Sequence, residues 1–319
     1  MEQKVNQTYS QNWVAYNQAQ TREKLLFMEL LNGLCETIEE PKYNFGRPKL
    51  SLSDMVFCCA FKIYSTFSGR RFTSDMKFAE ESNFISKAPH YNSIFNYLKN
   101  PKLTPILKQL IEKSSLPLKA IETDFAVDSS GFTSNRYSRW FEFKYGKNTA
   151  MKIWIKAHLM CGVRTKIVTA IELTEAMGAD TSMLANLVTR TAQNFTVREV
   201  SADKAYSSRK NYNAINDVGG KGYIPFKINA TGRSDGSYLW SKMFHYFMYN
   251  REEFMQHYHK RSNVETAFHM IKSKFGTCLR SKTKVAQINE VLCKILCHNL
   301  CVLIQEMHEL GINKESVIS

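Results

Sequence analysis

The spacing of apolar residues changes near Pro117, and this change constrains the fold more than any other feature of the sequence. Before it, apolar residues recur every three or four positions in segments separated by turn residues, which is the pattern of short helices. After it, several segments alternate apolar and polar residues, which is the pattern of half-buried strands. We therefore expect a helical domain over residues 1–118 and a second domain of strands and helices over residues 119–319.

The first part predicts five helices, marked by their apolar spacing, by capping residues and by prolines near the first turn. Their expected ranges are 21–38, 52–67, 73–84, 91–98 and 104–113. Short helices joined by tight turns suit a DNA reader of the helix-turn-helix type. The alternative is a helical domain that serves only for packing or dimerisation.

The second part predicts an α/β fold. Strands are expected at 119–127, 151–161, 167–173, 196–201 and 222–226. Helices are expected at 181–191, 206–218, 261–275 and 285–310, with a mostly polar segment before the third of these. The order β-β-β-α-β-α-β-α is that of a mixed sheet flanked by helices, the layout of a ribonuclease-H-like fold.

The charge of the chain favours a polyanionic partner. Its 43 Lys and Arg against 29 Asp and Glu leave a net charge of +14 over 319 residues. Residues 260–284 alone contain seven Lys and Arg and a single acid, Glu265. Basic side chains on phosphates gain affinity by releasing counterions, so nucleic acid is the expected partner, although such an excess can also serve solubility alone.

Cysteine usage and hydropathy point to a reducing compartment. The eight cysteines contain no CxxC pair, and residues 1–20 lack the apolar run of a signal peptide. The longest apolar stretch, 291–304, is too short for a bilayer, which needs ~20 apolar residues. We expect reduced thiols, no membrane and a cytoplasmic location. Cys293, Cys297 and Cys301 recur every four residues, which indicates buried packing and not a zinc site.

Two acids follow predicted strands. Asp128 follows residues 125–127 and Asp203 follows residues 200–202, and a small or polar loop follows each acid. The carboxyl ends of neighbouring strands converge in an open sheet, so we expect the two acids to meet. Either one could instead only cap a loop. Asp124 competes with Asp128 but lies nearer the start of the strand.

A third acid, Glu265, lies on a predicted basic helix. On one continuous helix at 100° per residue, Tyr258, Arg261 and Lys272 fall within about 40° of Glu265. A separate apolar stripe should pack on the sheet. The stripe consists of Val264, Phe268, Ile271 and Phe275. The alternative is that Arg261 and Glu265 form only a surface pair four residues apart.

Three carboxylates brought together repel one another, and a divalent cation relieves this repulsion. Oxygen ligands suit Mg²⁺ or Mn²⁺. Two such ions ~4 Å apart can activate the attacking oxygen and stabilise the leaving oxygen during displacement at phosphorus. We therefore predict that Asp128, Asp203 and Glu265 are catalytic residues that bind two ions.

The spacing Tyr258-x2-Arg261-x3-Glu265-x6-Lys272 resembles the Y-R-E-K signature of insertion-sequence DDE transposases. Residues 127–132 and 203–206 are similar to the first and second aspartate motifs of that family. Residues 65–71 and 89–93 are similar to the N-terminal region of related prokaryotic transposases. The resemblance extends over roughly residues 45–305.

The resemblance implies that Asp128, Asp203 and Glu265 form a metal-binding triad, with the other three signature residues holding DNA near the cut strand. It implies hydrolysis at a transposon end, followed by attack of the freed 3′-hydroxyl on target DNA. The implied partner is double-stranded DNA, both terminal repeats and target, bound by a dimer in the cytoplasm at the nucleoid. Only 61 residues separate Asp203 from Glu265, so the large β-rich insertion of some relatives is expected to be absent.

Two other functions suit the same sequence. A ribonuclease-H-like nuclease would cut DNA without joining it, because fold and triad do not determine whether a joining step comes after hydrolysis. A catalytically silent DNA-binding protein derived from a transposase would use the helical domain alone. Elsewhere, His158 is expected to be a structural histidine, and Trp140 and Trp154 are either core residues or DNA-stacking residues.

Overall fold

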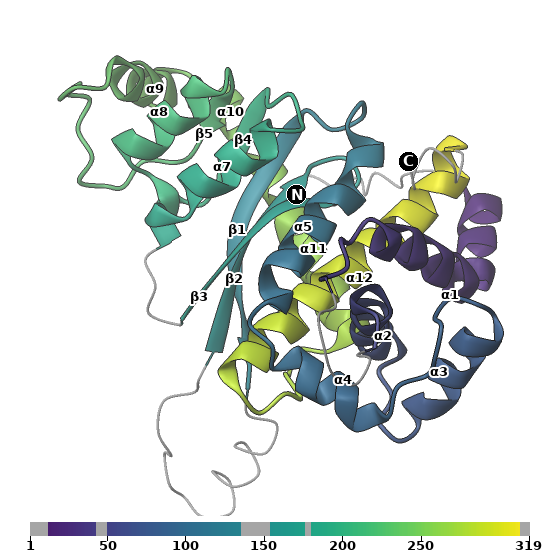
Figure 1. The fold of residues 1–319 in the computed structure, drawn as a ribbon. Helices are drawn as coiled ribbons and strands as arrows, with labels where there is room; N and C mark the ends of the chain where they lie inside the picture. Colours follow the sequence, from purple (N-terminus) through teal and green to yellow (C-terminus); the bar gives the residue numbers. More distant parts are fainter. Residues whose placement is uncertain (1–11, 43–49, 135–153, 176–179, 313–319) are drawn as a thin grey trace, which may run out of the picture.

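The computed structural model describes residues 12–42, 50–134, 154–175 and 180–312 of the chain (Figure 1). The N-terminal part is helical, as predicted. Its helices are α1 (Trp13–Glu36), α2 (Leu52–Ser65), α3 (Phe72–Glu81), α4 (Tyr91–Leu98) and α5 (Leu103–Ser115). Helix α1 begins eight residues earlier than predicted, because the side chain of Asn12 accepts a hydrogen bond from the Ala15 N–H and caps it there.

A five-stranded mixed sheet follows, which confirms the predicted fold class. Its order is β3-β2-β1-β4-β5. The strands are β1 (Asp124–Thr133), β2 (Trp154–Gly162), β3 (Val168–Glu175), β4 (Glu199–Ala202) and β5 (Lys221–Tyr223). Strands β1, β2 and β3 are antiparallel, whereas β4 runs parallel to β1 and β5 parallel to β4.

Strand β1 lies further along the chain than the predicted range 119–127. The residues before Asp124 do not pair in the sheet. Among them, the buried carboxylate of Glu122 accepts hydrogen bonds from the N–H and the hydroxyl of Thr165, the latter at 2.7 Å. At its other end, β1 continues to Thr133 because it keeps pairing with β2. Asp128 therefore lies within the strand, and the prediction that it closes the strand is wrong.

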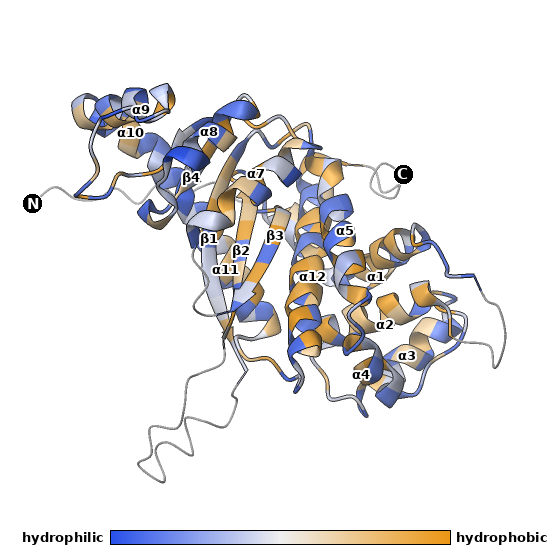
Figure 2. Cartoon of the chain, turned by 60° about the vertical axis from the view of Figure 1, so that its left-hand side comes forward, coloured by the Kyte–Doolittle hydropathy of each residue, from blue (hydrophilic) through white to orange (hydrophobic). Residues whose placement is uncertain are grey.

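Helices cover both faces of the sheet (Figures 1 and 2). The helices that follow the first strands are α7 (Leu184–Ala192), α8 (Arg209–Asp217), α9 (Tyr238–Tyr249), α10 (Arg251–Tyr258), α11 (Ser262–Phe275) and α12 (Lys284–Leu310). Helices α9 and α10 occupy the mostly polar segment, in which the sequence analysis predicts no element. Ser237 caps α9, and Trp240 and Met243 anchor it in the core, although much of its surface is exposed.

The sheet separates two apolar clusters. One gathers around α7, α8 and α9, and it receives Phe125 and Val127 of β1. The other receives Ala126 from the opposite face of β1 and joins α11 and α12 to the N-terminal helices. This second cluster continues across residue 118, so α12 forms a core shared by the two parts of the chain (Figure 2).

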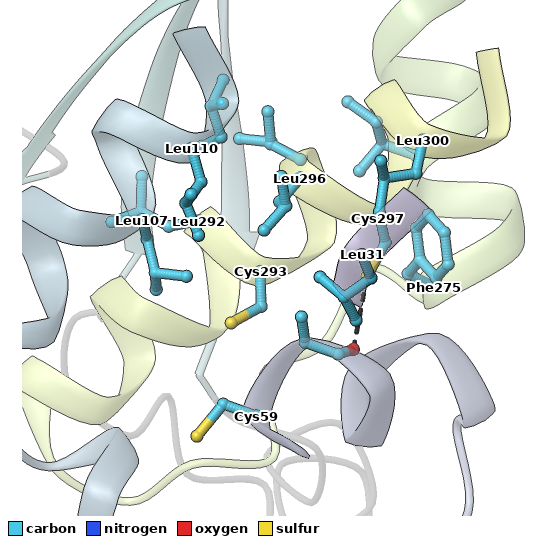
Figure 3. Packing of buried hydrophobic residues seen from close by; sticks show 14 of the residues in the cluster. Leu31, Cys59, Leu107, Leu110, Phe275, Leu292, Cys293, Leu296, Cys297 and Leu300 are labelled. Carbon is cyan, nitrogen blue, oxygen red and sulfur yellow. Dashed lines mark hydrogen bonds between the residues drawn. The ribbon is translucent and has the colours of Figure 1, made fainter. Parts of the chain in front are cut away.

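Helix α12 lies at the centre of that core. Its leucines Leu292 and Leu296 face Leu107 and Leu110 of α5 (Figure 3). The Cys297 thiol lies 3.4 Å from the carbonyl oxygen of Ala60 in α2. Among the described residues, α12 alone is long and apolar enough to cross a membrane, and 89% of its most apolar window is buried inside the protein.

The cysteines behave as the sequence predicts. None of the eight, all of which lie in the described ranges, is joined in a disulfide. Cys293 and Cys297 are fully buried in the apolar cluster, and Cys301 packs against it. The prediction that this helical series serves for packing is confirmed.

Candidate active site

Asp128 lies where β1 loses its parallel neighbour. The pairing of β1 with β4 ends at Val127 and Ala202, and Asp128 is the next residue of β1. Asp203 is the next residue after β4. The two acids therefore occupy adjacent positions at the point where the pairing of β1 with β4 ends. The two strands thus bring their acids together, as the sequence predicts, although β4 ends at this point and β1 continues.

Asp203 also caps a turn. Its carboxylate accepts a hydrogen bond from the Ala205 N–H at 2.9 Å and begins the 3₁₀ turn η3 (Lys204–Tyr206). The capping alternative weighed for these acids is therefore realised at Asp203. It leaves the other carboxylate oxygen free for a second role.

The third acid reaches the sheet through an arginine. Arg261 ends the 3₁₀ turn η4 (His259–Arg261), and Glu265 lies in the first turn of α11. Arg261 Nη1 donates to Asp128 Oδ2 at 2.5 Å, and Nη2 donates to Glu265 Oε1 at 2.7 Å. The Arg261 side chain is 19% exposed. The four-residue pair exists, but the same guanidinium also binds the sheet.

The electrostatics of Asp128 indicate crowded negative charge. Burial raises the pKa of Asp128 above its ordinary value, and the charges of Asp203 and Glu265 add to the rise. The Ser129 N–H, 2.7 Å from Asp128 Oδ1, and the Arg261 guanidinium oppose it without cancelling it. Each of the two other acids is therefore close enough to affect the ionisation of Asp128.

Lys272 extends the site along β1. Its ammonium donates to Ser130 Oγ at 2.6 Å, two residues beyond Asp128. It lies 5.3 Å from the ring centroid of Phe132 and 5.8 Å from that of Phe268. Burial lowers the pKa of Lys272. Alternate residues of a strand share a face, so Lys272 and Arg261 contact the same face of β1.

Tyr258 is placed differently from the prediction. It ends α10, and η4 separates it from α11, so the assumption of one continuous helix through all four signature residues is wrong. Its ring centroid nevertheless lies 5.8 Å from the guanidinium carbon of Arg261. On α11 itself the predicted stripe holds: Val264, Phe268, Ile271 and Phe275 are buried.

A neighbouring lysine that sequence reasoning treated only as positive charge fixes this turn in place. Lys260 donates to Asp124 at 2.8 Å and to Glu199 at 2.7 Å, at the starts of β1 and β4. Arg198 binds Asp124 through two further hydrogen bonds. Although partial burial opposes it, these bonds hold the pKa of Asp124 below its ordinary value. Asp124, the competing candidate, is thus engaged at the far end of the strand pair.

His158 is a structural histidine, as predicted. It is buried, and its ring nitrogens lie 3.2 Å from the Tyr206 hydroxyl and 2.8 Å from that of Thr174. Burial lowers its pKa to about 4. Trp140 and the side chain of Trp154 lie outside the described part of the structure.

The acids suit a metal ion by chemistry but are not gathered around one. Carboxylates are the ligands that Mg²⁺ and Mn²⁺ prefer. Within the described ranges, no three His, Cys, Asp or Glu side chains are grouped so that they could hold an ion. The binding of common ions by Asp128, Asp203 and Glu265 stays a prediction. Arg261 supplies the counter-charge to Asp128 and Glu265.

A mixed sheet flanked by helices, with acids on two neighbouring strands and on an adjoining helix, is consistent with a ribonuclease-H-like domain of the transposase type. The model of the family described as Transposase DDE domain matches residues 119–300, more than half of the chain, and the protein belongs to this family. A search of the curated proteins and a search of the solved structures found no match to this chain. A transposase-type function acting on DNA follows from the family.

Proposed function

We propose that this protein is a DNA transposase that cleaves transposon ends with the help of a divalent metal and joins them to target DNA. The observation that carries the proposal is the docking of α11 on β1 within the family match. Arg261 joins Asp128 to Glu265, and Lys272 reaches Ser130 on the same strand. Residues from two segments that lie far apart in the chain thus meet around Asp128.

Each signature residue has a role in this proposal. Asp128, Asp203 and Glu265 bind Mg²⁺ or Mn²⁺, with two ions in the complete site. When bound, the metal activates the attacking oxygen and stabilises the leaving oxygen. Tyr258 and Arg261 hold the DNA near the cut strand. Lys272 holds the backbone further along β1, where the Ser130 hydroxyl orients its ammonium.

The partner in this proposal is double-stranded DNA, first at the terminal repeats and then at the target. The net charge of +14 favours such a partner because each phosphate contact releases counterions. The helical part of the chain contributes to DNA binding, and the active complex is a dimer at the nucleoid in the cytoplasm.

The test uses purified Asp128→Ala, Asp203→Ala and Glu265→Ala with a paired-end DNA substrate and Mg²⁺. Each variant should lose cleavage and strand transfer while DNA binding stays largely intact. Asp217→Ala is the control, since this exposed acid ends α8 and takes no part in the site, and it should still cleave.

The outcomes separate the alternatives. Cleavage retained in one of the three alanine variants removes that residue from the site. Cleavage by the wild type without joined products indicates the nuclease. If the wild type binds DNA and nicks it under no condition with Mg²⁺ or Mn²⁺, the protein is the catalytically silent DNA-binding form.

A further inference from the structure

All three acids of the candidate site already accept hydrogen bonds from the protein. Asp128 accepts from the Ser129 N–H with one oxygen and from Arg261 with the other. Glu265 accepts from the second terminal nitrogen of Arg261, and Asp203 accepts from the Ala205 N–H. A cation that needs the oxygens of Asp128 and Glu265 therefore competes directly with one guanidinium.

Arg261 is held in this position from two sides. Its backbone belongs to η4, which Lys260 ties to Asp124 and Glu199 at the starts of β1 and β4. On its other side the Tyr258 ring lies within cation–π distance of the guanidinium. Because the backbone is anchored, the acids can be freed by a movement of the Arg261 side chain alone.

The same two nitrogens are the ones that a DNA phosphate would use. A guanidinium binds phosphate or carboxylate through paired N–H groups, and both terminal nitrogens of Arg261 are committed to acids. A phosphate that binds through both terminal nitrogens therefore competes with these two carboxylates for the N–H groups and the charge of Arg261. Phosphate binding by Arg261 and metal binding by the acids thus favour each other.

We propose that Arg261 is a latch on the metal site, which closes Asp128 and Glu265 to metal in the free protein and opens when a DNA phosphate draws the guanidinium away. The proposal rests on the proposed function, because it takes these acids as metal ligands. As a consequence, the protein binds its catalytic metal tightly only when DNA is in place. Metal-dependent cleavage is then limited to DNA whose phosphate reaches Arg261.

The first experiment measures Mn²⁺ binding to the full chain without DNA by electron paramagnetic resonance. Arg261→Gln should bind Mn²⁺ at least about tenfold more tightly than the wild type, because two carboxylates lose their competitor. Arg261→Lys should lie between them, since an ammonium is a point charge without the paired geometry. Lys204→Gln, which removes an exposed positive charge next to Asp203, is the control and should leave the affinity within about twofold.

The second experiment adds a short DNA duplex of random sequence as a source of phosphate and repeats the Mn²⁺ titration. The duplex should tighten Mn²⁺ binding in the wild type, and Mn²⁺ should tighten duplex binding by the same factor. Both effects should be absent in Arg261→Gln. A residue that only stabilises the fold would not change this coupling.

Two results would overturn the latch, and they differ in what else they affect. Equal Mn²⁺ affinity in the wild type and in Arg261→Gln, with binding lost in Asp128→Asn, rejects the latch and leaves the proposed function in place. Mn²⁺ binding that is insensitive to Asp128→Asn in every background rejects the latch and the proposed metal site together. The wild-type coupling between duplex and Mn²⁺ needs no variant, so a misfolded variant cannot obscure the result.

Discussion

Buried histidines should make the stability of this protein depend on pH, and His298 is one of two whose pKa burial lowers to about 4. His298 of α12 is 2% exposed, and its Nε2 lies 3.0 Å from the Lys166 carbonyl oxygen. Burial lowers its pKa to about 4, below the ordinary value of about 6.5. Between these two values the unfolded chain binds a proton that the folded protein excludes, so the free energy of unfolding falls as the pH falls.

We expect His298 to contribute a loss of about 2 kcal/mol in unfolding free energy between pH 8 and pH 5. Denaturant unfolding at both pH values measures it, as the difference between the wild type and His298→Gln. His269→Gln, at an exposed position, is the control and should keep the wild-type pH dependence. The same pH dependence in His298→Gln and the wild type would show that this histidine is not the source.

At the scale of one element, α12 is joined to its neighbours by buried polar contacts as well as by leucines. The Asn299 side-chain amide donates to the carbonyl oxygens of Ile111 and Val168 and to the Ser114 hydroxyl, and its oxygen accepts from the Val168 N–H. One side chain thus connects α12, α5 and β3. These groups are buried, so removing their partner leaves them without water to replace it.

Asn299→Leu should destabilise the protein by about 2–4 kcal/mol, because it leaves the N–H and C=O of Val168 without this side-chain partner in an apolar interior. Denaturant unfolding at neutral pH measures the change. Gln305→Leu, one to two turns further along α12 at a partly exposed site, should change stability by no more than about 0.5 kcal/mol. Equal costs for the two substitutions would refute the role of the buried amide.

At the scale of the whole molecule, the two predicted parts share a core. The apolar cluster around α12 includes residues of α1, α2 and α5 from the helical part and of α11 from the sheet part. A fragment of residues 119–319 would expose the face of α12 that these helices cover. An exposed apolar face promotes association. Without the N-terminal helices the fragment also lacks a large part of the apolar burial that stabilises the full chain.

We therefore expect the fragment 119–319 to aggregate, or to lack a cooperative unfolding transition, whereas the full chain unfolds cooperatively. Size-exclusion chromatography and thermal unfolding followed by circular dichroism measure both properties, with the full chain as the control. A monomeric fragment with its own sharp transition would instead show that the boundary at residue 118 separates independent domains.

Local pattern was sufficient for most elements and failed where distant partners decide the outcome. The stripe on α11 follows from helical spacing, and α2 begins at Leu52 as predicted, where Ser51 caps it. The length of β1 depends on β2, which continues the pairing beyond Asp128. Helix α9 was missed because its aromatic residues serve two environments, some buried and others exposed, such as Tyr238 and Tyr249. Such a mixture has no clear period.

The candidate site divides in the same way. The spacing from Arg261 to Glu265 and on to Lys272 is a property of one short segment, so the sequence alone identifies these residues as a unit. Which acid the Arg261 guanidinium binds across the sheet depends on how α11 lies against β1. The 3₁₀ turn before α11 rotates Tyr258 relative to Glu265, and uniform helical counting does not include such a turn.

The sequence by itself determined the change from helices to strands, the basic character of residues 260–284 and the choice of Asp128, Asp203 and Glu265 as candidate acids. Only the tertiary structure decided that Asp128 lies within a strand, that Lys260 anchors the signature turn and that one arginine stands between two acids. The physical reason is that periodicity and spacing are local, whereas strand register and helix docking result from packing between segments that lie far apart in the chain.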